Sequence, residues 1–125
     1  MTTRWNIAES RTIRIALSAL LALAAPSAAW ADRSQDLQSE ISQRADEAGR
    51  YETQAANAES NGNKAEACRL YRNASATWQE AASAGTSLIV ETMNDSNLDA
   101  DVVNENVHIM LNNSTADDER AQAVC

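Results

Sequence analysis

Two cysteines carry the best-defined chemistry in this chain. Cys68 and Cys125 are the only ones among 125 residues, and a lone pair in an oxidising compartment favours an internal disulfide. Two alternatives remain: Cys125 pairs with a second chain to give a covalent homodimer, or both cysteines stay as free thiols. No C-x-x-C motif is present, and a nucleophilic cysteine needs a histidine base. We therefore expect no catalytic role for either thiol.

An acidic turn is the candidate for cation binding. Side-chain oxygens recur at alternate positions, in Asp95, Asn97, Asp99 and Asp101. This spacing is similar to the first half of an EF-hand calcium loop, but Ala100 replaces the glycine of its turn and Asn106 its bidentate glutamate. A polar turn whose Asp99 caps the next helix is the simpler interpretation. We assign no metal site and no cofactor, and keep calcium or another cation as the alternative.

The single histidine, His108, is the remaining candidate for acid–base chemistry. Helical spacing places it on a polar face with Asp101, Asn104, Glu105 and Asn112. One histidine among exposed carboxylates is poor evidence for a metal site. No carboxylate pair is recognisable in an apolar surrounding, as general acid–base catalysis would require. The sequence therefore predicts that the protein is not an enzyme.

The first 31 residues have the pattern of an export leader. Arginines at positions 4, 11 and 14 precede the apolar run Ile15–Ala25, and Ala29-Trp30-Ala31 forms a small-x-small cleavage site. The apolar run is too short for a hydrocarbon layer of about 30 Å, although an uncleaved anchor remains the alternative. We predict a cleaved Sec-type signal peptide (1–31), a single domain (32–125) without a membrane span, and a periplasmic or secreted location, typical of bacteria.

The predicted mature segment is strongly acidic and poor in large apolar residues. From Asp32 onward it holds seven basic and seventeen acidic residues, a formal net charge of −10, and sixteen alanines. Such a charge gives no electrostatic footprint for nucleic acid or anionic lipid and leaves cationic partners or metal ions, although solubility of an exported helical protein is the simpler interpretation. Alanine buries little area, so close helix packing, a disulfide or a partner must add stability.

Helical periodicity predicts a long antiparallel hairpin. The first helix runs from about Gln35 to Ser60 with Ser34 as its N-cap, and Asn61-Gly62-Asn63 ends it. Its apolar face is Leu37, Ile41, Ala45, Ala48, Tyr51, Ala55 and Ala58. The second helix begins at Lys64 and ends near Asn94. Its stripe at steps of four and three is Ala67, Tyr71, Ala74, Trp78, Ala81, Gly85 and Leu88.

A C-terminal helical arm should fold back along the second helix. We predict a helix over 99–112, a break at 112–114, and a short last helix to Val124, opened by a capping box of Ser114 and Asp117. The inward residues are Leu98, Val102, Val103, Val107, Met110 and Leu111. At about 1.5 Å per residue, Cys68 and Cys125 reach the same height on neighbouring elements. The prediction is an all-α bundle of three to four helices.

The hairpin also resembles a known repeat. Over Ala48–Ala81, the residues Tyr51, Ala55, Gly62, Ala67, Tyr71 and Ala74 have the spacing of one tetratricopeptide repeat. Gln54, Ala58 and Gln79 depart from that pattern, and no second copy is present. The resemblance implies a helical hairpin that binds a protein or peptide. The alternative is that any alanine-rich hairpin converges on these spacings.

These observations predict a small exported helical protein that acts as a protein- or peptide-interaction module. Its alternative function is binding of a cation or small ligand at residues 95–101.

Overall fold

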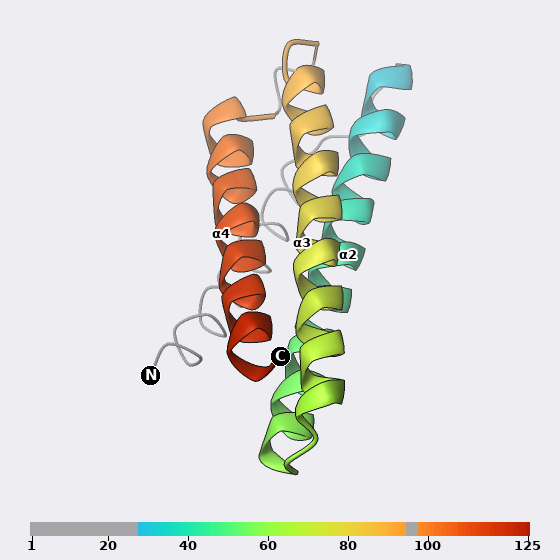
Figure 1. Cartoon of the computed structure of the whole chain (residues 1–125). Helices are drawn as coiled ribbons and strands as arrows, with labels where there is room; N and C mark the ends of the chain where they lie inside the picture. Colours follow the sequence, from blue (N-terminus) through green and yellow to red (C-terminus); the bar gives the residue numbers. More distant parts are fainter. Residues whose placement is uncertain (1–27, 95–97) are drawn as a thin grey trace.

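Three helices form the part of the chain that the computed structural model describes, residues 28–94 and 98–125. They are α2 (Ala28–Ser60), α3 (Lys64–Glu91) and α4 (Ala100–Val124), and these ranges contain no strand. In Figure 1, α3 lies between α2 and α4 and runs antiparallel to both. The outer helices pack along α3 and scarcely touch each other. The predicted all-α fold, with a hairpin and a folded-back arm, is confirmed.

The first helix starts earlier than predicted. The leader prediction falls on residues outside the described ranges, except for Ala28–Ala31, which form the first turn of α2. Ser34 therefore lies inside the helix, where its side chain is buried. The prediction of Ser34 as the N-cap is wrong, because the helical backbone continues through it toward the N-terminus.

The turn between α2 and α3 forms as its residues predict. Gly62 has a φ of +78°, a conformation that glycine adopts without strain. The backbone N–H of Asn63 donates to the carbonyl of Ala58 at 2.8 Å, which closes the end of α2. The side chain of Asn63 then accepts from the N–H of Glu66 and caps α3. One short segment thus ends one helix and starts the next.

The core divides into two clusters along the length of the bundle. The upper core lies toward the α3–α4 connection and the lower core toward the α2–α3 turn. The upper core contains Ile41, Ala45, Ala48, Trp78, Ala81, Ala82, Ala84, Leu88, Leu98, Val103, Val107 and Met110. The lower core contains Ala55, Ala67, Leu70, Tyr71 and Ala121. Every residue of the predicted stripe on the second helix is buried, so the periodicity placed that helix correctly.

Gly85 allows α4 to approach α3 closely within the upper core. A Cβ at this position would lie 2.6 Å from Cγ2 of Val107 and 3.3 Å from Cε of Met110. Glycine is less favourable than alanine in a helix by about 1 kcal/mol. It is nevertheless suited to this position, because a side chain here would push α4 away. Close packing against α4 thus explains why α3 contains a glycine at position 85 and continues beyond it.

The C-terminal arm is one continuous helix rather than two. The predicted break at 112–114 is wrong, because Asn113 and Ser114 are buried within α4. Ser114 bonds to α3: its Oγ donates to the Ser75 carbonyl at 3.0 Å, and its hydroxyl also pairs with the Ser75 hydroxyl at 2.9 Å. This contact between helices holds the polar segment in helical form, overriding its weak propensity.

Two residues predicted to face inward on α4 do not. Val102 and Leu111 are exposed, whereas Asn106 and Asp117 are buried. Because α4 packs against a single helix for most of its length, its buried face is narrow.

At the upper end, Arg33 of α2 donates through Nε to Glu91 of α3 at 2.6 Å, linking the first two helices. None of the described helices is long and apolar enough to cross a membrane.

Candidate functional site

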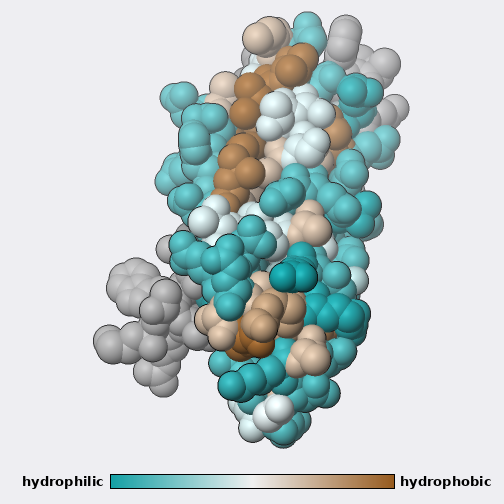
Figure 2. All heavy atoms as spheres, in the orientation of Figure 1, coloured by the Kyte–Doolittle hydropathy of each residue, from teal (hydrophilic) through white to brown (hydrophobic). Residues whose placement is uncertain are grey.

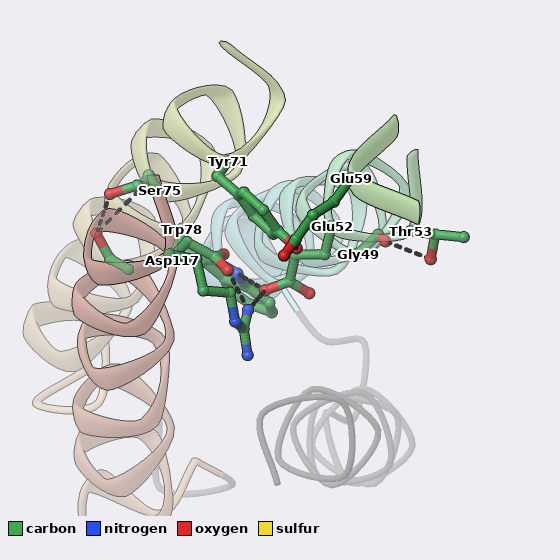
Figure 3. Close-up of polar contacts among 10 residues, drawn as sticks. Gly49, Glu52, Thr53, Glu59, Tyr71, Ser75, Trp78 and Asp117 are labelled. Atoms are coloured by element: carbon green, nitrogen blue, oxygen red, sulfur yellow. Dashed lines mark hydrogen bonds and ion pairs between the residues drawn. The ribbon is translucent and has the colours of Figure 1, made fainter. Parts of the chain in front are cut away.

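A cluster of charged groups lies where all three helices meet, between the two cores. Figure 3 shows Glu52 of α2, Trp78 of α3 and Asp117 of α4 pointing toward one another. Arg120, one turn after Asp117, contacts both carboxyl groups. We call Glu52, Trp78, Asp117 and Arg120 the polar junction.

Each member reaches the junction because it occupies a core-facing position of its helix. Glu52 lies on the buried face of α2, with Ala48 before it and Ala55 after it. Asp117 takes the position between Ser114 and Ala121 on the buried face of α4. At three- and four-residue steps these side chains point to the same side as their apolar neighbours. Tertiary packing therefore forces two carboxyl groups into the interior.

One hydrogen bond and one ion pair of the junction meet at the same oxygen of Glu52. The indole Nε1–H of Trp78 donates to Oε2 of Glu52 at 3.1 Å. Nη1 of Arg120 lies 3.8 Å from the same oxygen and donates to Oδ1 of Asp117. One guanidinium thus faces two carboxyl groups, a ratio that leaves one negative charge in excess if both are ionised. A buried uncompensated charge is strongly unfavourable.

A proton on Asp117 removes this excess negative charge. Burial, then the hydrogen bond and charge of Glu52, raise the pKa of Asp117 to about 9, against a lowering effect of Arg120. Oδ2 of Asp117 is buried and accepts no hydrogen bond from the described residues. When this oxygen carries the proton, it becomes a donor to Glu52. Asp117 therefore carries a proton at neutral pH.

Tyr71 extends the junction toward the lower core. Its hydroxyl donates to Oε1 of Glu59 at 2.9 Å, and the guanidinium of Arg120 lies 5.9 Å from the centre of its ring. Burial first, and then the hydrogen bond to Glu59, raise the pKa of Tyr71 to about 12. Tyr71 stays a neutral donor at physiological pH, and it orders Arg120 on one side and Glu59 on the other.

The disulfide closes the lower end of the bundle. Cys68 and Cys125 are bonded, with their Cα atoms 5.3 Å apart, which confirms the internal pairing within this chain. The bond ties the second turn of α3 to the residue that follows α4. Because Asp117 and Arg120 lie just before this covalent link, the last turns of α4 are held at two points.

The other predicted site residues do not assemble. Asp95 and Asn97 lie outside the described residues. The Asp99 side chain accepts from the N–H groups of Asp101 and Val102, so it caps α4 as predicted. His108 is exposed on the polar face of α4. Within 28–94 and 98–125, no three His, Cys, Asp or Glu side chains gather closely enough to hold a metal ion.

Sequence reasoning missed the polar junction. The expectation that no carboxylate pair lies in an apolar surrounding is wrong, because Glu52 and Asp117 meet against Trp78. One signal marked Glu52 alone: an acidic residue interrupts the alanine face of the first helix at position 52. Asp117 was instead interpreted as part of a helix cap, because its spacing from Ser114 matches a capping box.

The carboxyl pair of the junction is closed off from the surface. Asp117 is 0% exposed and Glu52 8% exposed, so no group of substrate size reaches the carboxyl pair in this arrangement. General acid–base catalysis needs the reacting atom within hydrogen-bond distance of the carboxyl. What remains accessible to chemistry at this site is a proton.

Exposed apolar side chains gather instead at the upper end of the molecule. Val90 and Met93 lie at the end of α3, and Val102 lies in the first turn of α4; Met93 is 83% exposed. Figure 2 shows an oblique band of hydrophobic surface running down from this end, with hydrophilic surface beneath it and a second, smaller hydrophobic area farther down. The exposed acidic residues Asp99 and Asp101 also lie at this end. We call the three apolar residues the upper patch.

Comparison with protein-family models, curated proteins and solved structures found no match for this chain. Its function must therefore be inferred from its own residues.

Proposed function

We propose that this protein is a small exported interaction module that binds a cationic protein or peptide through the upper patch. The observation that carries the proposal is the exposure of Val90, Met93 and Val102 at one end of the bundle. Exposed apolar side chains grouped at one place are typical of binding surfaces. Trp78 and Tyr71, by contrast, are buried and not available to a partner.

Charge supports a partner of the opposite sign. The segment from Asp32 onward has a formal net charge of −10, and Asp99, Asp101 and Glu105 are exposed near the upper patch. A basic segment with an apolar anchor fits such a surface, since the charges steer its approach and the apolar contact slows its release. We infer that ionic strength weakens the complex.

Export is supported by the leader pattern and by the disulfide. The residues that form the predicted leader include a positive region, an apolar run and a small-x-small site. A disulfide such as Cys68–Cys125 persists in oxidising compartments, including the bacterial periplasm. Expression of the full chain in a bacterium, fractionation and intact mass measurement test this: the periplasmic species should begin at Asp32. An uncut chain in the cytoplasm would contradict export.

The similarity of residues 48–81 to a tetratricopeptide repeat supports the same class of function, since such hairpins bind proteins. It does not support the inner face of the hairpin as the binding surface. Tyr71 and Ala74, which carry the pattern, are buried. A partner would therefore bind outside the positions that give the resemblance.

A photo-crosslinking amino acid at position 93 tests the binding surface directly. In the native host, a discrete protein should be labelled from position 93 but not from Asn57, an exposed residue near the opposite end. The purified partner should then bind Val90→Ser/Met93→Ser at least about tenfold more weakly than the wild type. Leu111→Ser, another exposed apolar residue away from this end, is the matched control. Equal affinity of all three proteins would refute the proposal.

A further inference from the structure

The polar junction has the components of a pH-sensitive latch. Two carboxyl groups from different helices, Glu52 and Asp117, meet in the interior with a single guanidinium, Arg120. Oδ2 of Asp117 is buried and receives no hydrogen bond from the described part of the chain. A proton on this oxygen would supply its missing partner, because the protonated carboxyl could then donate to Glu52.

We propose that one proton shared by Glu52 and Asp117 locks the last turns of α4 against α2 and α3, and that its loss loosens them. With the proton in place, the two carboxyl groups and Arg120 sum to zero charge. Without it, two carboxylates face each other in the interior with one cation. The polar junction is the main polar link between α2 and α4, which otherwise scarcely touch, so repulsion there acts on the position of α4.

The neighbouring groups do not supply a second counter-charge. From α2, Glu59 faces the lower side of the junction and accepts from the hydroxyl of Tyr71 of α3. The indole of Trp78, also from α3, donates to Glu52 and does not titrate. From α4, Arg120 is the cation that contacts the pair. Glu59 is itself acidic, so it supplies no counter-charge to the pair.

The direction of the pH effect follows from the proton affinity of the folded chain. Burial and Glu52 raise the pKa of Asp117 from 3.8 to about 9. The folded chain therefore binds this proton more tightly than the unfolded chain, in which Asp117 has the ordinary pKa of an aspartic acid. The contribution of the group is fully present below about pH 4 and is lost as pH rises toward 9. The latch is closed in acid and opens in alkali.

The disulfide limits how far the loosened segment moves. Cys125 stays bonded to Cys68 of α3, so the residues from Asp117 to Val124 separate from α2 without detaching from the molecule. Apart from Trp78, whose N–H donates to Glu52, the members of the upper core have no polar side-chain group, so the rest of this core does not depend on the proton. Opening is therefore a local event at the lower half of α4, reversible when the pH falls.

Carbon-detected NMR of the side-chain carboxyl of Asp117 in the full chain tests the shared proton. In the wild type we expect a titration midpoint near 9. In Glu52→Gln, whose amide can donate to Asp117 and removes the second negative charge, the midpoint should fall clearly below that of the wild type, while burial still holds it above the ordinary value of an aspartic acid. Titration of Asp117 near 4 in the wild type would overturn the proposal, and so would an unchanged midpoint in Glu52→Gln.

Hydrogen exchange and thermal unfolding test the loosening. After correction for intrinsic rates, amides of residues 117–124 should exchange faster at pH 9 than at pH 6, while those of Trp78 to Leu88 stay unchanged. Asp117→Asn should remove this pH dependence and flatten the fall of Tm between these pH values. Asp118→Asn is the matched control, since it removes the same charge from the exposed neighbour. Identical pH profiles for the two variants would overturn the proposal, and failure of Asp117→Asn to fold leaves the Glu52→Gln titration to decide it.

Discussion

The two ends of the bundle are stabilised by different means. The upper core combines large apolar side chains, including Ile41, Leu88 and Met110, with five alanines. The lower core has one leucine, one tyrosine and small alanines, and beside it lie the polar junction and the disulfide. Trp78 joins the two regions, because its ring belongs to the upper core while its N–H donates to Glu52.

The difference shows how a short chain compensates for a lack of large apolar residues. Burial stabilises roughly in proportion to apolar area, at about 25 cal/mol per Å², so an alanine-lined contact contributes little. Where that contribution is small, a covalent bond and a singly protonated carboxyl pair hold the helices. Each responds to a solution condition, redox potential or pH, to which the upper core is indifferent. The four substitutions below test this contrast.

Removal of the disulfide should produce the largest effect. The bond links residues 57 positions apart, and the loop-entropy estimate for such a closure is about 4 kcal/mol of unfolding free energy. Cys68→Ser/Cys125→Ser should lose about this amount in denaturant titration, and its last turns of α4 should exchange hydrogen fastest. Reduction of the wild type should give the same loss. A stability unchanged by reduction would contradict the role given to the lower end.

Truncation of Leu88 should be the next largest, at the opposite end. This side chain is fully buried in the upper core, and removal of a buried leucine leaves a cavity worth about 3 kcal/mol. The loss should be independent of pH and of reductant, unlike the effects at the lower end. Val90→Ala is the control, since Val90 is exposed two residues away and should change stability by less than about 0.5 kcal/mol. A loss of stability in Leu88→Ala that depends on pH would contradict the distinction between the two regions.

Addition of one methyl group at Gly85 should destabilise the upper core by overpacking. A Cβ there meets Val107 at 2.6 Å, and we expect a loss of about 2 kcal/mol despite the better helix propensity of alanine. Val107→Ala in the same chain should recover part of the loss, which a double-mutant cycle measures. Ser83→Ala, on the exposed face of α3, should be nearly neutral. A stabilised Gly85→Ala would show that α4 can shift away from α3 freely.

Loss of the cap at the start of α4 should have the smallest of the four effects. The carboxylate of Asp99 accepts from two backbone N–H groups, and Asp99→Ala should cost about 1 kcal/mol. Asp99→Asn keeps the acceptor and should be close to wild type. Calorimetry of the same proteins with calcium tests the alternative function, because a cation held by Asp99 would lose affinity in both variants. An equal loss of stability in the two variants would indicate that charge, not capping, is the contribution of Asp99.

Local patterns were enough to predict most of the architecture. The stripe from Ala67 to Leu88 has a strict period and follows an Asn-Gly-Asn turn, so its helix and its buried face were both correct. The disulfide followed from counting the rise along two antiparallel elements. These features depend on residues close in sequence, or on simple geometry, and tertiary contacts did not overrule them.

The polar features could not be predicted because they depend on contacts between distant residues. Ser114 stays helical through bonds to Ser75, 39 positions away, while its local sequence favours a cap. Glu52 and Asp117 belong to helices that are not neighbours in the chain, and nothing local shows that they meet. The start of α2 before Ser34 was missed for the related reason that Ser34 is a good cap by type alone.

The bond between Cys68 and Cys125 also gives the molecule an uneven response to mechanical force. Tension applied between the start of α2 and Cys125 passes through the sulfurs directly to Cys68, so α3 beyond Cys68 and all of α4 carry no load. Stretching would separate α2 from α3 and stop there. The longest extension is then set by residues 28–68, at no more than about 3.6 Å each, until reduction releases the enclosed ring.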